Sequence, residues 1–175
     1  MRAYRIFRIV LLKEASSVGR SVNLQLLWTF LCSFIGIGAI AWLNYTFLEV
    51  KDYVFLIGSF GASAVILYAS PGSPFAKPRN LFGGHLISAF IGVTISILCP
   101  EPLWFSSGLA VSSAIVIMQM TKTIHPPGGA TALIAIIGSE KIKSLGFFYL
   151  ISPVLSGILI LFLTFTLGRK FIKIK

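Results

Sequence analysis

The sequence has few acidic residues, and few charged residues of either sign. Only 11% of its 175 residues are charged, with five Asp and Glu against fifteen Lys and Arg. A soluble domain of this length needs more polar surface to cover its core. Because 56% of the residues are hydrophobic and the mean hydropathy is +0.91, the composition predicts an all-α integral membrane protein in contact with the lipid bilayer.

Motifs for catalysis and for metal binding are also missing. The sequence contains no Ser-His-Asp set, no metal-ligand spacing and no phosphate-binding loop, so we expect neither an enzyme nor a bound metal or cofactor. Cys32 and Cys99 lie in or at the end of apolar runs, which predicts packed thiols rather than a disulfide or a metal pair. The basic residues flank apolar runs, which favours an anionic membrane surface over nucleic acid as their partner.

Six apolar segments free of charged residues can be marked out. A helix needs roughly 17 to 25 residues to cross the hydrocarbon core. By this measure the first, second, fourth and sixth segments are long enough, the third is borderline, and the fifth is too short. The fifth is either a re-entrant half-helix or part of a broken helix that starts near Thr121. The segments comprise residues 23–47, 53–70, 84–99, 103–120, 128–138 and 146–167.

The basic residues suggest how the chain is divided and oriented. We expect residues 1–22 to form a basic amphipathic segment on the cytoplasmic membrane surface, not a signal peptide. Residues 23–168 would form the transmembrane domain and residues 169–175 a basic cytoplasmic tail. Alternation of basic and non-basic loops favours six crossings with both termini cytoplasmic, in a bacterial inner membrane. Lys141 and Lys143 fit this poorly, and a fifth segment that turned back would place the tail outside.

The two halves of the chain show a repeated pattern. Residues 61–66 match residues 129–134, and residues 86–88 match residues 150–152. With three segments in each half, the halves would be inverted relative to each other, a plan in which secondary transporters bind substrate at the repeat interface. Chance matches within the small alphabet of membrane helices are the alternative.

The sharpest local feature is the stretch from Thr121 to Thr131. Its two prolines remove backbone donors, so the preceding helix should end by about Ile124. The glycine pair allows close backbone approach, and the next helix would offer free N–H groups to an anion. A structural break with His125 bonded to a backbone carbonyl is equally compatible. The candidate binding residues here are Lys122, His125, Pro126, Pro127, Gly128, Gly129 and Thr131.

Two more stretches contribute candidate binding residues. Gly61 and Ser63 belong to a second Gly-rich helix start, for which helix packing is the alternative. Arg79 has the forked donors that suit an anion, and Asn80 would cap the following turn, close to His85. An ordinary basic loop is the alternative for this stretch.

Small residues and acidic residues narrow the possible roles further. The small residues recur at every fourth position in two segments and predict helix–helix contacts. All the acidic residues lie outside the six segments, which weakens a carrier driven by a bound cation. The small residues are Ser88, Gly92 and Ser96, and Ser106, Ala110 and Ala114; the acids are Glu14, Glu49, Asp52, Glu101 and Glu140.

Two motifs resemble those of the HPP family of integral membrane proteins. Residues 125–133 resemble its His-Pro-Pro signature, and residues 73–85 are similar to a second stretch typical of the family. The resemblance covers residues 24–167, with Lys77 in place of the usual Gln. It implies four membrane-spanning helices, which short or re-entrant second and fifth segments would reconcile with six apolar ones. It also implies a link to nitrite transport, described for some members.

These observations predict transport of a small inorganic anion, nitrite being the first candidate. The alternatives are a membrane scaffold that does not transport, and a cation pathway lined by backbone carbonyls. We also expect a homo-oligomer, because a body of six short helices buries little surface by itself.

Overall fold

The computed structural model describes residues 2–47 and 57–171, with the side chains of residues 24–46 and 57–170. These residues contain helices and no strand, which confirms the all-α membrane fold. Four helices are long and apolar enough to cross a membrane. They are residues Leu24–Thr46 of α1 (Arg2–Phe47), α3 (Pro78–Leu98), α4 (Leu103–Met120), and Leu150–Lys170, which joins η3 (Leu150–Leu155) to α7 (Ser156–Phe171).

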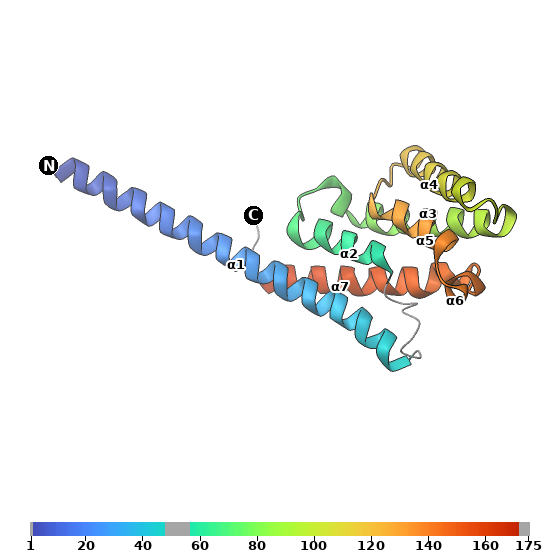
Figure 1. The fold of residues 1–175 in the computed structure, drawn as a ribbon. Helices are drawn as coiled ribbons and strands as arrows, with labels where there is room; N and C mark the ends of the chain where they lie inside the picture. The colour runs from blue at the N-terminus through green and yellow to red at the C-terminus, as the bar shows by residue number, and fades with distance from the viewer. Residues whose placement is uncertain (1, 48–56, 172–175) are drawn as a thin grey trace.

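The second and fifth apolar segments form shorter helices. The second is α2 (Gly58–Ala64) with the π-helical turn η1 (Val65–Ala69), and the fifth is α5 (Pro127–Ile137). The expected six crossings are therefore not confirmed, and the four long helices agree with the count implied by the family resemblance. Along the chain these long and short helices run alternately in opposite directions (Figure 1).

The first helix is longer than its apolar segment. The backbone of α1 continues unbroken from Arg2 to Phe47, so no helix break marks the boundary expected at residue 22. The N-terminal half of α1 extends well beyond the other helices (Figure 1). At the other end of the chain, α7 continues to Phe171, and the rest of the expected basic tail lies outside the described residues.

Two helix ends near the middle of the chain have clear local causes. Helix α3 starts at Pro78, before the charge-free segment begins, because proline suits the first helical position and needs no backbone donor. As predicted, α4 ends before Ile124. Thr123 N donates to Met118 O and Lys122 N to Gln119 O, which is a Schellman motif. Lys122 occupies its left-handed position, with φ of 56°.

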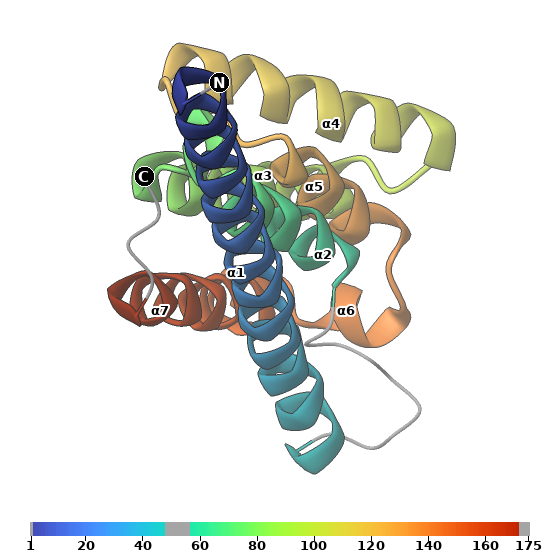
Figure 2. The same cartoon turned by 90° about the vertical axis from the view of Figure 1, so that its left-hand side faces the viewer.

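Helices α2, α3 and α5 form a layer between α4 on one side and α7 on the other (Figures 1 and 2). Helix α3 packs against α4, α5 and η3, while α1 packs along α7. The prediction that small residues mark helix–helix contacts is confirmed. Ala110 and Ala114 of α4 are fully buried, and a Cβ atom on Gly92 of α3 would lie 2.6 Å from the carbonyl oxygen of Ala132 in α5.

We predict that Gly92→Ala lowers the free energy of unfolding by about 1–3 kcal/mol, because the α5 backbone must move away from the added methyl group. The matched control is Gly108→Ala on α4, where an added Cβ meets nothing within 4 Å. That change should be neutral, or stabilising by up to about 1 kcal/mol. Thermal unfolding in a mild detergent measures both, and equal melting temperatures would contradict the close α3–α5 contact.

Candidate functional site

Five polar side chains are buried together where α2, α3 and α5 meet. Ser59 and Ser63 come from α2, His85 from α3, Thr131 from α5, and His125 from the connection before α5. Each has 0% exposed surface. Polar side chains at such positions in a membrane protein are costly unless they are paired. We name these five residues the polar cluster.

Hydrogen bonds join the whole polar cluster. The Ser63 hydroxyl bridges the two imidazole rings, with Oγ 2.7 Å from His85 Nε2 and 3.0 Å from His125 Nε2. On the other side of its ring, His85 Nδ1 lies 2.7 Å from Thr131 Oγ1, which lies 2.9 Å from Ser59 Oγ. His125 Nδ1 bonds the carbonyl oxygen of a surface residue outside the cluster. All four ring nitrogens therefore have partners.

Three hydrogen bonds attach the connection 121–126 to α3 and to the loop before it. His125 Nδ1 donates to Phe75 O at 2.9 Å, Arg79 Nη2 to Thr121 O at 2.7 Å, and Asn80 Nδ2 to Ile124 O at 2.7 Å. The expectation that Asn80 caps its own helix is wrong. Because α3 already begins at Pro78, Asn80 lies within its first turn and its side chain reaches across to the neighbouring connection.

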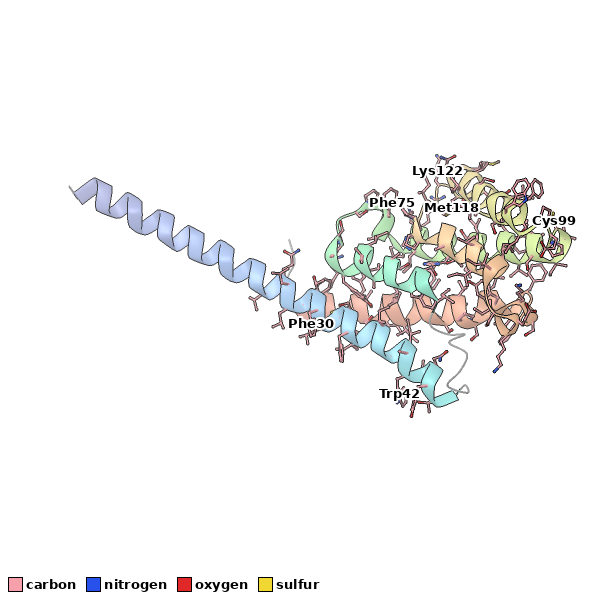
Figure 3. All side chains as sticks on the ribbon, in the orientation of Figure 1. Phe30, Trp42, Phe75, Cys99, Met118 and Lys122 are labelled. Carbon is pink, nitrogen blue, oxygen red and sulfur yellow. The ribbon has the colours of Figure 1, made fainter. Side chains whose placement is uncertain are left out.

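Exposed basic residues gather at the end of the helices nearest the polar cluster. Lys77 and Arg169 line one shallow groove, and Arg79 reaches the residue before Lys122. Figure 3 shows Phe75 and Lys122 toward this end and Cys99 at the opposite one. We name this surface, formed by Lys77, Arg79, Lys122 and Arg169, the basic end.

The opposite end carries charges of both signs. Glu101 follows α3 there, and Lys143 of α6 (Glu140–Ser144) forms an ion pair of 3.2 Å with Glu140. One of the two lysines that fit the predicted loop pattern poorly is therefore paired with an acid.

Four of the twelve predicted binding residues come together in the polar cluster, namely Ser63, His85, His125 and Thr131. Two more lie beside it. The Pro127 carbonyl oxygen is 3.4 Å from Thr131 Oγ1, and a Cβ on Gly128 would lie 2.7 Å from Ser88 Oγ. The glycine at 128 is thus explained by close packing of α3 and α5, as the structural alternative expected.

The other six predicted residues lie outside the cluster. Lys122 and Arg79 are exposed and Asn80 is half-buried, all near the surface of the connection 121–126. Gly61 and Pro126 are exposed and Gly129 is half-buried. An added Cβ on Gly61 meets nothing within 4 Å, so no close contact requires glycine there. A role for any of these residues in binding stays a prediction.

Ser59, Phe75 and Tyr149 belong to the site but were not among the predicted residues. Ser59 had a signal, because it lies one helical turn before Ser63 and therefore on the same face. The Tyr149 hydroxyl donates to Thr131 O at 3.1 Å from a buried position. A tyrosine in an apolar run and a backbone carbonyl, as at Phe75, carry no signal in the sequence.

The environment of His125 determines its protonation. This residue lies outside the four long helices. Burial lowers the pKa of His125 to about 4, while the hydrogen bond to the Phe75 carbonyl acts to raise it. At neutral pH the ring is neutral, and because Nδ1 donates to a carbonyl, Nε2 holds the lone pair.

Two grooves open on the outer faces of the helices. One, of about 390 Å³, lies between α1 and α7 and includes Trp28 and Leu167. The other, of about 540 Å³, lies between α4 and α5 and includes Met118 and Leu133. The lining of both is mostly apolar, with Thr164 in the first and Gln119 in the second, and no member of the polar cluster lines either. The cluster is closed to these surfaces in this conformation.

Four long apolar helices, two short ones and a buried polar centre define a polytopic α-helical membrane protein. The family described as "HPP, transmembrane region" matches residues 19–173, and the chain belongs to this family. The resemblance seen in the two sequence motifs is therefore confirmed.

The chain is also similar to two curated proteins of Dictyostelium discoideum, each named a transmembrane protein. They are 46% and 44% identical over 147 residues, which make up 82% of this chain and 47% and 51% of the relatives. The chain thus spans about half the length of the curated relatives it matches. These relatives give no support to the bacterial membrane predicted from the sequence. No solved structure matches the chain.

Lys122 provides a test of the connection that positions His125. A residue with a side chain loses roughly 1 kcal/mol of stability at positive φ, and glycine, which has no Cβ atom, does not. We predict that Lys122→Gly raises the free energy of unfolding by about 1 kcal/mol, measured by thermal unfolding in detergent. Lys143→Gly is the matched control, since the same change within the regular helix α6 should destabilise. A less stable Lys122→Gly variant would contradict the assigned turn.

Proposed function

We propose that this protein carries a small inorganic anion across the membrane, with nitrite as the first candidate. The observation that carries the proposal is the polar cluster, buried in an apolar helical body directly next to the basic end. The exposed cations of the basic end attract anions toward this side of the molecule. In the sequence all five acidic residues lie outside the apolar segments, so no carboxylate there would repel an anion.

The residues near the cluster offer the donors that an anion needs. Hydroxyl and imidazole groups can turn hydrogen atoms toward it. The expectation that the start of α5 offers free backbone N–H groups is wrong, because Gly128 N already donates to His125 O and Gly129 N to Pro126 O. Because neither outer groove reaches the cluster, the anion would enter through a movement of the short helices α2 and α5. Lys122 retains a costly backbone conformation at the entrance, as functional positions often do.

The same charges support an orientation. Cytoplasmic loops of membrane proteins carry an excess of Lys and Arg. With the basic end in the cytoplasm, the start of α3, the end of α4 and the end of α7 lie on the cytoplasmic side, and both termini are cytoplasmic.

Uptake into liposomes tests the transport proposal. We expect saturable nitrite uptake above that of protein-free liposomes, compared with chloride, nitrate and formate. Arg79→Gln and His125→Asn should each lower nitrite uptake by at least about tenfold, which corresponds to about 1.4 kcal/mol for one lost charged or hydrogen-bonded contact. Lys143→Gln, at the opposite end, is the matched control and should leave uptake unchanged. Equal uptake in all three variants would remove the assigned roles.

A scaffold that does not transport is the second candidate. The complete pairing within the polar cluster favours it, as do small residues that face outward, such as Gly61 and Ala62 of α2. Purification in a mild detergent distinguishes the two functions. A stoichiometric protein partner, with no anion uptake by folded and inserted protein, would favour the scaffold.

A further inference from the structure

The shallow groove of the basic end lies between the start of α3 and the last turns of α7. Its volume is about 340 Å³, within the range of roughly 300–1,000 Å³ that is common for ligand pockets. Lys77 lies just before α3 and Arg169 near the end of α7, so two segments far apart in the sequence each supply one cation. No member of the polar cluster lines this groove.

Both cations are available to a ligand. Within the described part of the chain neither side chain forms an ion pair, and the acids with described side chains, Glu101 and Glu140, lie at the opposite end. The guanidinium carbon of Arg169 lies 5.4 Å from the ring centroid of Phe165, which is buried. This cation–π contact positions the guanidinium without using its N–H groups, which can therefore donate to an anion.

The floor of the groove is apolar and continues toward the interior of the membrane. Phe162 and Phe165 of α7 line it on one side and Pro78 of α3 on the other. Phe162 lies two helical turns before Arg169, about 10 Å along the helix axis. Since α7 ends at Phe171, Arg169 is near the membrane surface and Phe162 is deeper. The groove thus changes from cationic to apolar in the same direction as a bilayer changes from headgroups to hydrocarbon.

We infer that this groove binds one anionic phospholipid of the surrounding leaflet. The lipid phosphate lies between the two cations, where Arg169 offers forked donors and Lys77 a compact charge. One acyl chain follows the aromatic floor toward the bilayer interior. A zwitterionic lipid is bound less well, because its own cationic group is repelled by the same two side chains. The site is separate from the proposed anion pathway, since the polar cluster has no contact with it.

Lys170 distinguishes a built site from the general attraction between basic residues and an anionic leaflet. It follows Arg169 directly and carries the same charge in the last turn of α7, but it does not line the groove. Consecutive helical residues point about 100° apart, so the two side chains leave the helix in different directions. If leaflet charge alone mattered, Lys170 and Lys77 would contribute alike. A site in the groove requires Lys77 and not Lys170.

Native mass spectrometry of the full chain, released from a mild detergent, tests the inference. With added phosphatidylglycerol we expect one lipid bound per chain, at least about tenfold more tightly than phosphatidylcholine with the same acyl chains. Lys77→Gln and Arg169→Gln should each weaken phosphatidylglycerol binding by about tenfold, as expected for one lost charge-assisted contact. Lys170→Gln is the matched control and should change the affinity by less than about twofold. Equal melting temperatures of all four proteins without lipid would show that the losses do not come from misfolding.

Several results would overturn the lipid site. Equal losses in Lys77→Gln and Lys170→Gln would leave only the general attraction of an anionic surface. If glycerol 3-phosphate, which has no acyl chain, bound as tightly as the lipid, the groove would belong to a soluble phosphate compound. A dimer of the chain that excludes phosphatidylglycerol would assign this surface to a second copy. Because lipid binding is measured without anion uptake, none of these results decides the transport proposal.

Discussion

The hydroxyl group of Ser63 joins three separate parts of the chain in surroundings that hold few other polar groups. It contacts His85 on α3 and His125 in the connection before α5, while its own residue belongs to α2. Two imidazoles without partners in an apolar interior would each cost several kcal/mol. The positions of the three segments are therefore coupled, and a shift of any one leaves at least one ring nitrogen unpaired.

The short helices follow from the same requirement. Helix α5 begins at Pro127 because the preceding residues must bring His125 Nδ1 to Phe75 O and its Nε2 to Ser63. A longer helix through this point would carry His125 away from both partners. Close packing of α3 and α5 then requires small residues, as Gly92 shows where it meets the α5 backbone.

Much of the cluster was predictable, because few polar residues interrupt the apolar segments and they therefore stand out. Ser63, His85 and Thr131 lie within these segments, whereas His125 was found in the proline- and glycine-rich stretch between two of them. The repeat pairs Ser63 with Thr131, and in the structure these two residues contact opposite nitrogens of the same His85 ring. The inverted relation of the two halves stays a prediction.

Other features could not be predicted from charge and hydropathy. Segment limits drawn at charged residues placed the start of α3 too late, because Arg79 is compatible with a first helical turn near a surface. The same rule separated residues 1–22 from the first segment, although charge alone does not interrupt a helix. The count of six crossings rested on the alternation of basic and non-basic loops, although the fifth segment is too short to cross, and the part of segment two before residue 57 lies outside the described residues.

The order of the helices along the chain also bears on how the protein assembles during synthesis, when N-terminal parts emerge first. Helix α1 can remain in lipid until its partner α7 arrives, since only 22% of its apolar window is buried even in the finished fold. His85 is different. Ser63 precedes it, but His125 and Thr131 are made at least 40 residues later. Until then one ring nitrogen of α3 has no native partner, and only the arrival of α5 completes the interior.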